Sequence, residues 1–182
     1  MWEYILKLGL IMLTVLPVCL LGRRPWREKT ARARVRVVFV VFMAGLLALT
    51  LEGEYQSPKA MAQSAIRRIK SGEGINMVPF RTIAGFFKHF SPDIFLVNIV
   101  GNIVMFMPWG FGLPLLWKKR QRFLSAAAYS LALPVLIETC QLFIGRSVDV
   151  DDLFLNFLGG CLGAVLYLGV RKLAPGVGKM AL

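Results

Sequence analysis

The chain has 182 residues, of which 57% are hydrophobic and 18% are charged, and its mean hydropathy is +0.63. Soluble domains have more charged and fewer apolar residues, so this composition excludes an ordinary soluble domain as well as disordered, collagen-like and disulfide-scaffold chains. The formal net charge of +12 would indicate nucleic-acid binding in a soluble protein, so the positions of the charges decide its meaning. The three cysteines lie inside apolar segments, where they are expected to act as small buried hydrophobic residues: Cys19, Cys140 and Cys161.

Two short apolar segments come first in the chain. Leu8–Gly22 and Val37–Leu51 each have 15 uncharged residues, fewer than the roughly 20 that a helix needs to cross the hydrocarbon core. We expect both to span, because Lys7 and Arg36 can extend their charged groups to the interface. The chain does not start with the basic residues of a signal peptide, and no small-residue cleavage site follows the first segment. We therefore expect this segment to be retained rather than removed as a signal peptide.

A long connection, residues 52–95, follows the second segment. Within it, Ser57–Lys70 has apolar residues at helical spacing beside basic residues, which predicts a short amphipathic helix. A surface helix is the simpler interpretation of this pattern, and a specific lipid site is the alternative. After a flexible break at residues 71–74, we expect residues 76–95 to lie in the outer interface or to enter the membrane as a re-entrant segment.

Three longer apolar segments complete the chain. Ile94–Trp117 has 24 residues without a charge, Leu153–Val170 has 18, and Phe123–Gly145 carries a single charge at Glu138. Each is long enough to cross a membrane. The predicted fold is therefore an all-α polytopic helix bundle. It has about five transmembrane helices, an interfacial or re-entrant segment between helices 2 and 3, and one integral membrane domain over residues 1–182.

The charges divide unequally between the two sides of these spans. Arg23–Arg36, Lys118–Arg122 and the C-terminal tail together carry a net charge of +13, whereas the opposite side, with Glu138 included, carries −1. An excess of Lys and Arg marks cytoplasmic loops. We therefore predict a multi-pass inner-membrane protein with its N-terminus outside and its C-terminus in the cytoplasm. The net charge thus indicates orientation and not a nucleic-acid partner.

Polar residues inside the spans are the candidate functional residues, because lipid offers them no hydrogen-bond partner. In the predicted orientation they lie in the outer halves of their helices or at the outer helix ends: Asn98, Asn102, Glu138, Gln141, Asp149, Asp152 and Asn156. Spacings of three and four residues place the members of each helix on one face. For the two asparagines, the alternative is a hydrogen bond that holds two helices together.

The acidic residues and their neighbours allow more than one interpretation. Glu138 is either part of an ion pair, with Arg146 as the candidate cation, or a catalytic or substrate-binding group. Asp149 or Asp151 can cap the fifth helix, since an N-cap carboxylate accepts backbone N–H bonds. The spacing of Asp152 instead directs it inward.

Motifs for cofactors and for the common catalytic arrangements are absent from the sequence. His89 has no Cys or second His at ligand spacing, which argues against a zinc site. The acidic residues could supply oxygen ligands to Ca²⁺ or Mg²⁺, but we favour no metal and no other cofactor. No Ser-His-Asp arrangement, P-loop or dinucleotide-binding motif is present. The spacing of Gly159 and Gly163 favours close packing within the bundle.

Six segments carry motifs in a fixed order along the chain: Asn76–Ile83, with an Asn-x-x-Pro-Phe element, Val97–Gly110, Ile137–Gln141, Arg146, Asp149–Asp152 and Asn156–Gly160. Together they resemble the VanZ-like family over residues 76–169. The resemblance implies a small bacterial inner-membrane protein, and the family's namesake is associated with resistance to the glycopeptide antibiotic teicoplanin. The first motif adds accessory interfacial residues to the candidates: Asn76, Pro79, Phe80 and Arg81.

The resemblance and the predicted topology together give a functional hypothesis. The substrate-binding candidates surround one polar pocket that opens to the outer leaflet: Asn98, Asn102, Glu138, Gln141, Arg146, Asp149, Asp151, Asp152 and Asn156. Membrane lipid is the expected partner, and a lipid-linked cell-wall precursor or a glycopeptide is a further candidate. A membrane enzyme with Glu138 as acid or base is the alternative function. A small transporter or flippase comes third, because the inner halves of the spans lack matching polar groups.

Overall fold

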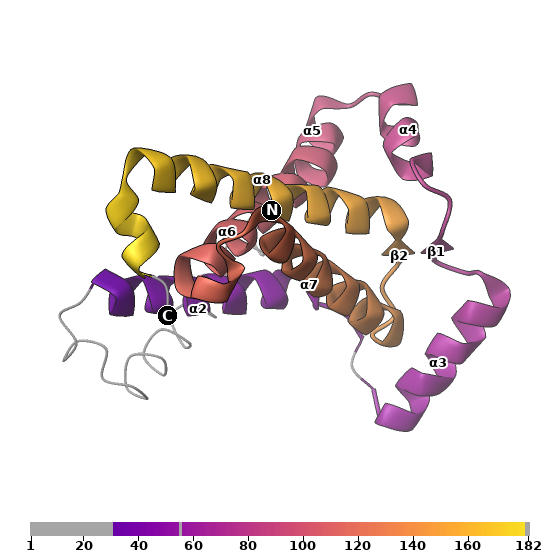
Figure 1. Cartoon of the computed structure of the whole chain (residues 1–182). Helices are drawn as coiled ribbons and strands as arrows, with labels where there is room; N and C mark the ends of the chain where they lie inside the picture. The colour runs from indigo at the N-terminus through magenta and orange to yellow at the C-terminus, as the bar shows by residue number, and fades with distance from the viewer. Residues whose placement is uncertain (1–30, 55, 181–182) are drawn as a thin grey trace.

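The computed structural model describes residues 31–54 and 56–180, in which the regular secondary structure is helical apart from one pair of short strands (Figure 1). The longer helices are α2 (Ala31–Thr50), α3 (Pro58–Ser71), α4 (Arg81–Lys88), α6 (Gly101–Leu116), α7 (Phe123–Phe143) and α8 (Val150–Leu173). The shorter elements are β1 (Ile75–Asn76), α5 (Pro92–Phe95), the π-helix η1 (Leu96–Val100), the 3-10 helix η2 (Lys118–Arg120), β2 (Val148–Asp149) and the 3-10 helix η3 (Pro175–Met180). The predicted all-α class is confirmed.

Four helical stretches are long and apolar enough to cross a membrane: Ala33–Thr50, Pro92–Leu116, Phe123–Phe143 and Val150–Leu173. They correspond to the last four predicted spans, so the protein is a multi-pass membrane protein. The first predicted span, Leu8–Gly22, lies outside the described residues, and the count of five therefore stays a prediction. The described part of α2 includes the basic residues before the apolar run that starts at Val37, because arginine is a good helix former.

Glycines allow α6 and α8 to pack more extensively than any other pair of the described helices. A Cβ added at Gly159 would overlap the backbone carbonyl of Ile103, and one added at Gly163 would overlap that of Met107. Gly110 of α6 meets the backbone of α8 in the same way. The predicted role of Gly159 and Gly163 in close packing within the bundle is therefore confirmed, and α6 is the partner helix.

The main apolar core joins three of the spans. Its buried side chains come from α2, α6 and α7: Leu46, Phe106, Leu133 and Ile137. Outside this core the spans expose large apolar side chains, of which Val104, Leu124 and Leu136 are each more than half exposed. Extended apolar surface of this kind is suited to contact with lipid.

The third span is built from α5, η1 and α6, which follow one another without a break in the helix. Pro108 and Pro114 lie inside α6, and Pro134 lies inside α7. Each removes a backbone donor, but the helices continue through these positions. The π-helical turn is the irregular part of the span and contains Asn98.

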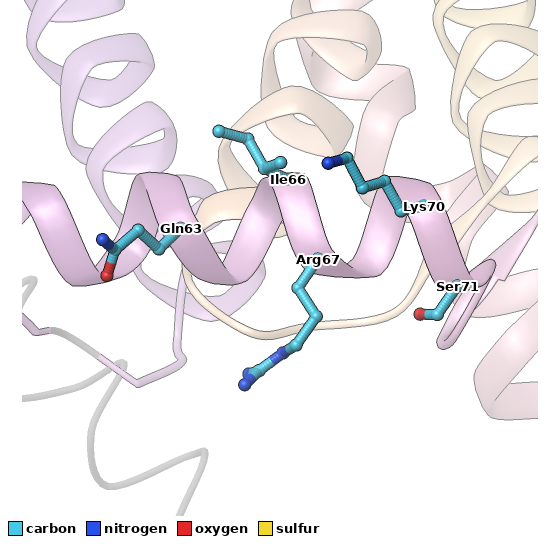
Figure 2. A pocket seen from close by; sticks show the side chains of 5 residues that line it. All are labelled: Gln63, Ile66, Arg67, Lys70 and Ser71. Carbon is cyan, nitrogen blue, oxygen red and sulfur yellow. The ribbon is translucent and has the colours of Figure 1, made fainter.

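α3 confirms the predicted amphipathic helix. Ala65 and Arg68 face the bundle and are buried, whereas Ile66 and Ile69 are more than half exposed. Figure 2 shows the residues that line a cavity of about 530 Å³ on this helix: Gln63, Ile66, Arg67, Lys70 and Ser71. The exposed part of α3 is therefore both apolar and basic.

A parallel two-stranded pair connects the segment after α3 to the segment after α7. Ile75 pairs with Val148, and Asn76 pairs with Asp149. The backbone N–H of Val148 also donates to the Gly74 carbonyl at 2.9 Å. Because α4 follows β1 and α8 follows β2, the pairing brings the N-terminal ends of α4 and α8 into contact (Figure 1).

Candidate functional site

Asp149 holds the two strands to the first turn of α8. It is the N-cap residue of that helix, and its carboxylate accepts from the backbone N–H of Asp151 at 2.9 Å. The same carboxylate accepts from the side-chain amide of Asn76 at 2.9 Å and from the hydroxyl of Thr82. The predicted capping role is therefore confirmed for Asp149, whose hydrogen bonds stabilise the fold.

Asp151 caps a helix to which it does not belong. Its side chain is 1% exposed and accepts from the backbone N–H groups of Phe80, Thr82 (2.8 Å) and Ile83 (3.1 Å). The first N–H groups of a helix have no partner within it, and a carboxylate suits their positive electrostatic potential. Phe80, the N-cap residue of α4, has φ 64° and supplies no side-chain cap. Asp151 therefore caps α4, and of the two residues predicted to cap the fifth helix, Asp149 is the one that does so.

The Asn-x-x-Pro-Phe element forms the turn that these two aspartates hold. Asn76 donates to both Asp149 and Thr82, at 2.9 and 3.0 Å. The ring of Phe80 packs edge-on against Phe154 of α8, with ring centroids 5.4 Å apart. The remaining two accessory residues are exposed: Pro79 and Arg81. The contacts of this element stabilise the docking of α4 on α8.

Arg68 has a structural role that the sequence analysis missed. Its side chain is 8% exposed. The guanidinium donates to the backbone carbonyls of Glu73 (3.3 Å), Gly74 (3.1 Å), Leu142 (3.0 Å) and Arg146. These bonds fix α3 to the loop that follows α7. All four acceptors are backbone groups, so no pattern of side chains in the sequence could have identified them.

Glu138 lies in the last third of α7 and is 7% exposed. Its carboxylate accepts from the backbone N–H of Asp149 at 3.1 Å. In the described part of the chain, no ion pair joins Glu138 to Arg146, whose guanidinium donates instead to the Glu52 carbonyl at 3.1 Å. The ion-pair interpretation of Glu138 is therefore wrong.

Asn102 connects α6 to α8. Its amide donates to the Asp152 carboxylate at 3.1 Å and to the Asn98 carbonyl within its own helix at 2.8 Å. Asn98 donates to the carbonyl of Ile94, also within its own helix, at 2.9 Å. The helix-to-helix interpretation is therefore confirmed for Asn102 and wrong for Asn98. By this contact Asn102 fixes the orientation of Asp152.

Two further amides of the candidate set are buried. Gln141 donates to the Thr50 carbonyl at 2.9 Å and thereby links α7 to the end of α2. Asn156 is 5% exposed, and within the described residues its side-chain oxygen Oδ1 has no hydrogen-bond partner. A buried acceptor without a donor costs about 1–3 kcal/mol. Asn156 is thus the candidate whose hydrogen bonding is least complete.

The candidates fall into two groups by what their polar atoms contact. The first group has side chains that bond within the fold: Asn76, Asn98, Asn102, Gln141, Arg146, Asp149 and Asp151. The second group, which we call the acceptor cluster, consists of Glu138, Asp152 and Asn156, each of which has a side-chain oxygen without a donor among the described residues. Asp152 and Asn156 are four residues apart on α8, which places them on one face of that helix. Glu138 accepts from the backbone N–H of Asp149, the N-cap residue of α8, and Asp152 lies in the first turn of the same helix. Both α7 and α8 therefore contribute to the cluster.

Two cavities lined by described residues include no member of the acceptor cluster. The cavity on α3 does not include its residues (Figure 2). A second cavity of about 530 Å³ is apolar and is lined by residues of α2, α6 and α8, among them Phe39, Met107 and Leu166. Among the described residues, no group of three or more His, Cys, Asp and Glu side chains is placed to hold a metal ion.

Two buried hydroxyl groups lie farther along α7 and α8, toward the helix ends that are away from the acceptor cluster. Ser130 and Tyr167 are fully buried, and in the described part of the chain neither hydroxyl oxygen has a partner. A Cβ added at Gly160 would meet the Ser130 side chain, so Ser130 packs against α8. The sequence-based argument that the inner halves lack polar groups is therefore incomplete.

A comparison with known protein families gives a match over most of these elements. The family model described as VanZ/LLP1 matches residues 37–172, which extend from α2 to the last turn of α8. The chain belongs to the VanZ/LLP1 family. No curated protein and no solved structure matches it. The resemblance found from the motifs is confirmed, and the VanZ/LLP1 match also includes α2, which lies before the first of those motifs.

Proposed function

We propose that this VanZ/LLP1 protein binds a cell-envelope component in a polar pocket that opens to the outer leaflet of a bacterial inner membrane. The observation that carries the proposal is the acceptor cluster, in which two carboxylates and an unpaired amide oxygen interrupt otherwise apolar spans. Ionisable groups at such positions are expensive to bury and usually belong to a functional site. The ligand would be a lipid headgroup, a lipid-linked cell-wall precursor or a glycopeptide.

The charge distribution supports the outward orientation of the cluster. The turn between α6 and α7 is basic, and α8 ends with Arg171 and Lys172. The first turn of α8, in contrast, contains Asp151 and Asp152. The acceptor cluster therefore lies near the ends of α7 and α8 that are opposite to the basic residues. Under the positive-inside rule, those basic residues are cytoplasmic and the cluster is on the outer side.

Cysteine labelling tests this orientation. In a chain whose native cysteines are replaced by alanine, we expect Ser147→Cys to react with a membrane-impermeant maleimide in intact cells. Ser147 is exposed in the loop between α7 and β2. Lys119→Cys, in the basic turn after α6, should react only after the membrane is opened. The reverse pattern would overturn the outward-facing pocket.

Growth on glycopeptides tests the role in the envelope. We expect a deletion strain to become more sensitive to a lipophilic glycopeptide such as teicoplanin than to one without a lipid tail. Wild-type protein should restore growth, whereas Glu138→Gln should restore no more than an empty vector, because it removes a charge from the acceptor cluster. Glu73→Gln makes the same chemical change at an exposed position and should restore growth fully. Equal restoration by both variants would contradict a role for the cluster in this phenotype.

A membrane enzyme that acts on a lipid-linked or peptide substrate is the second candidate function. Glu138 favours it, because one oxygen of this buried carboxylate is held by a backbone N–H and the other is left for proton transfer. Turnover that is lost in Glu138→Gln and retained in Asn102→Ala would select the enzyme over the binding protein. Labelling of Glu138→Cys from both sides of the membrane would instead select the third candidate, a transporter or flippase.

A further inference from the structure

The acceptor cluster has more hydrogen-bond acceptor oxygens than the described residues around it have donors. Asn102 donates to one oxygen of Asp152, and the backbone N–H of Asp149 donates to one oxygen of Glu138. Within residues 31–54 and 56–180, no donor group reaches the other oxygen of either carboxylate. Oδ1 of Asn156 is also without a donor. Three acceptor oxygens from two helices therefore have no donor among the described residues.

Among the residues that the structure describes, no positively charged side chain forms an ion pair with the cluster. The guanidinium of Arg146 is bonded instead to the Glu52 carbonyl at 3.1 Å. The negative charges of Asp149 and Asp151 act on Asp152. Burial of unpaired negative charge is costly unless a cation or several donors compensate it. A ligand that binds here must therefore bring positive charge together with N–H or O–H groups.

The burial of the three residues gives the direction from which a ligand can arrive. Glu138 and Asn156 are each more than nine-tenths buried. Asp152 is partly exposed and lies one helical turn before Asn156, toward the N-terminal end of α8. Asp152 would therefore contact the ligand nearest the surface, while Asn156 and Glu138 would contact its deepest atoms.

We propose that the acceptor cluster binds the protonated primary amine of an envelope component. A primary ammonium carries three N–H donors and one positive charge in a compact group, which matches one open oxygen on each of Asp152, Glu138 and Asn156. A quaternary ammonium has the charge without the donors, and an acylated amine has a donor without the charge. The inference rests on the binding function proposed above and specifies the chemical class of its ligand.

Two envelope components carry such an amine, namely the headgroup of an aminophospholipid and the free side-chain amine of a cell-wall peptide. Binding to the purified full-length protein in detergent distinguishes them. The first pair of probes is a short-chain phosphatidylethanolamine and its N-acetyl derivative, with the phosphatidylcholine counterpart as the quaternary control. The second pair is the peptide L-Ala-γ-D-Glu-L-Lys and its Nε-acetyl form.

We expect the free-amine member of one pair to bind at least about tenfold more tightly than its acetylated form, because charged hydrogen bonds are lost on acetylation. The pair that shows this difference identifies the source of the amine. Asp152→Asn and Asn156→Leu should each reduce the difference about tenfold. Asp93→Asn is the matched control for Asp152→Asn, since Asp93 is an exposed acid at the start of α5, and it should leave the difference unchanged.

Each contrary outcome identifies what has failed. Equal binding of amine and acetylated probes would overturn the amine inference and leave a binding pocket of other specificity in place. Binding of none of the probes, or saturation of the cluster by Mg²⁺ alone in competition with the amine, would likewise overturn it. Asn156→Ser is the milder second variant if Asn156→Leu does not fold, as judged by helical circular dichroism. Failure of the proposed outward pocket is recognised separately, by the labelling pattern of Ser147→Cys and Lys119→Cys.

Discussion

Gly163→Ala is expected to destabilise the helix bundle by about 3 kcal/mol, although alanine is the better helix former. The added Cβ would overlap the backbone carbonyl oxygen of Met107 and the backbone nitrogen of Phe111. Backbone atoms of a helix cannot move aside singly, so α6 and α8 would have to separate. We expect a lower midpoint for unfolding in a dodecyl sulfate titration, followed by helical circular dichroism in a mild detergent.

Gly169→Ala is the matched control for this prediction. Gly169 lies on the same helix, but nothing lies within 4 Å of a Cβ added there. Because alanine favours a helix over glycine by about 1 kcal/mol, the variant should equal or slightly exceed the wild type in stability. Identical midpoints for Gly163→Ala and Gly169→Ala would contradict the close contact between α6 and α8.

Asp151→Ala is expected to lower the free energy of unfolding by about 3 kcal/mol. The substitution leaves three backbone N–H groups at the start of α4 without their acceptor, and it removes the negative charge from that helix end. The turn at residues 76–83 should then detach from α8. Limited proteolysis of reconstituted protein should show faster cleavage within residues 76–90, together with a lower unfolding midpoint.

Two variants distinguish the loss of this helix cap from a general effect of removing a negative charge. Asp151→Asn keeps one acceptor oxygen in place and should lose less stability than Asp151→Ala. Asp93→Asn removes an exposed carboxylate and should match the wild type. Wild-type protease resistance in Asp151→Ala would show that Asp151 does not hold α4.

The effects of Gly163→Ala and Asp151→Ala differ in how much of each could be predicted from the sequence alone. The spacing of Gly159 and Gly163 indicated close helix packing, because small residues one turn apart leave room along one helix face. It could not name α6 as the partner, since the atoms that fill the room are backbone atoms of Ile103 and Met107. No pattern in the sequence indicated that Asp151 caps α4, because Asp151 and Thr82 are 69 residues apart in the chain.

The run of aspartates shows the same limit within the candidate site. Spacing indicated that Asp152 faces inward, and Asp152 does contact Asn102 of α6. Its neighbours Asp149 and Asp151 have the same side-chain chemistry and belong to the same motif. Only their hydrogen bonds to Asn76, Thr82 and the backbone of α4 show that they hold the fold.

The sequence by itself determined the membrane class, the positions of the four spans in the described residues, the amphipathic helix α3 and the family. These features depend on hydropathy, length and spacing along a single segment, and each can be evaluated locally. The tertiary structure decided which polar groups are satisfied, and so distinguished the acceptor cluster from the residues that hold the fold. The partners of those residues are largely backbone N–H and C=O groups, which every segment of the chain has in the same form. A sequence pattern cannot identify such partners, whereas a fold that brings α4 against α8 and α3 against the end of α7 does.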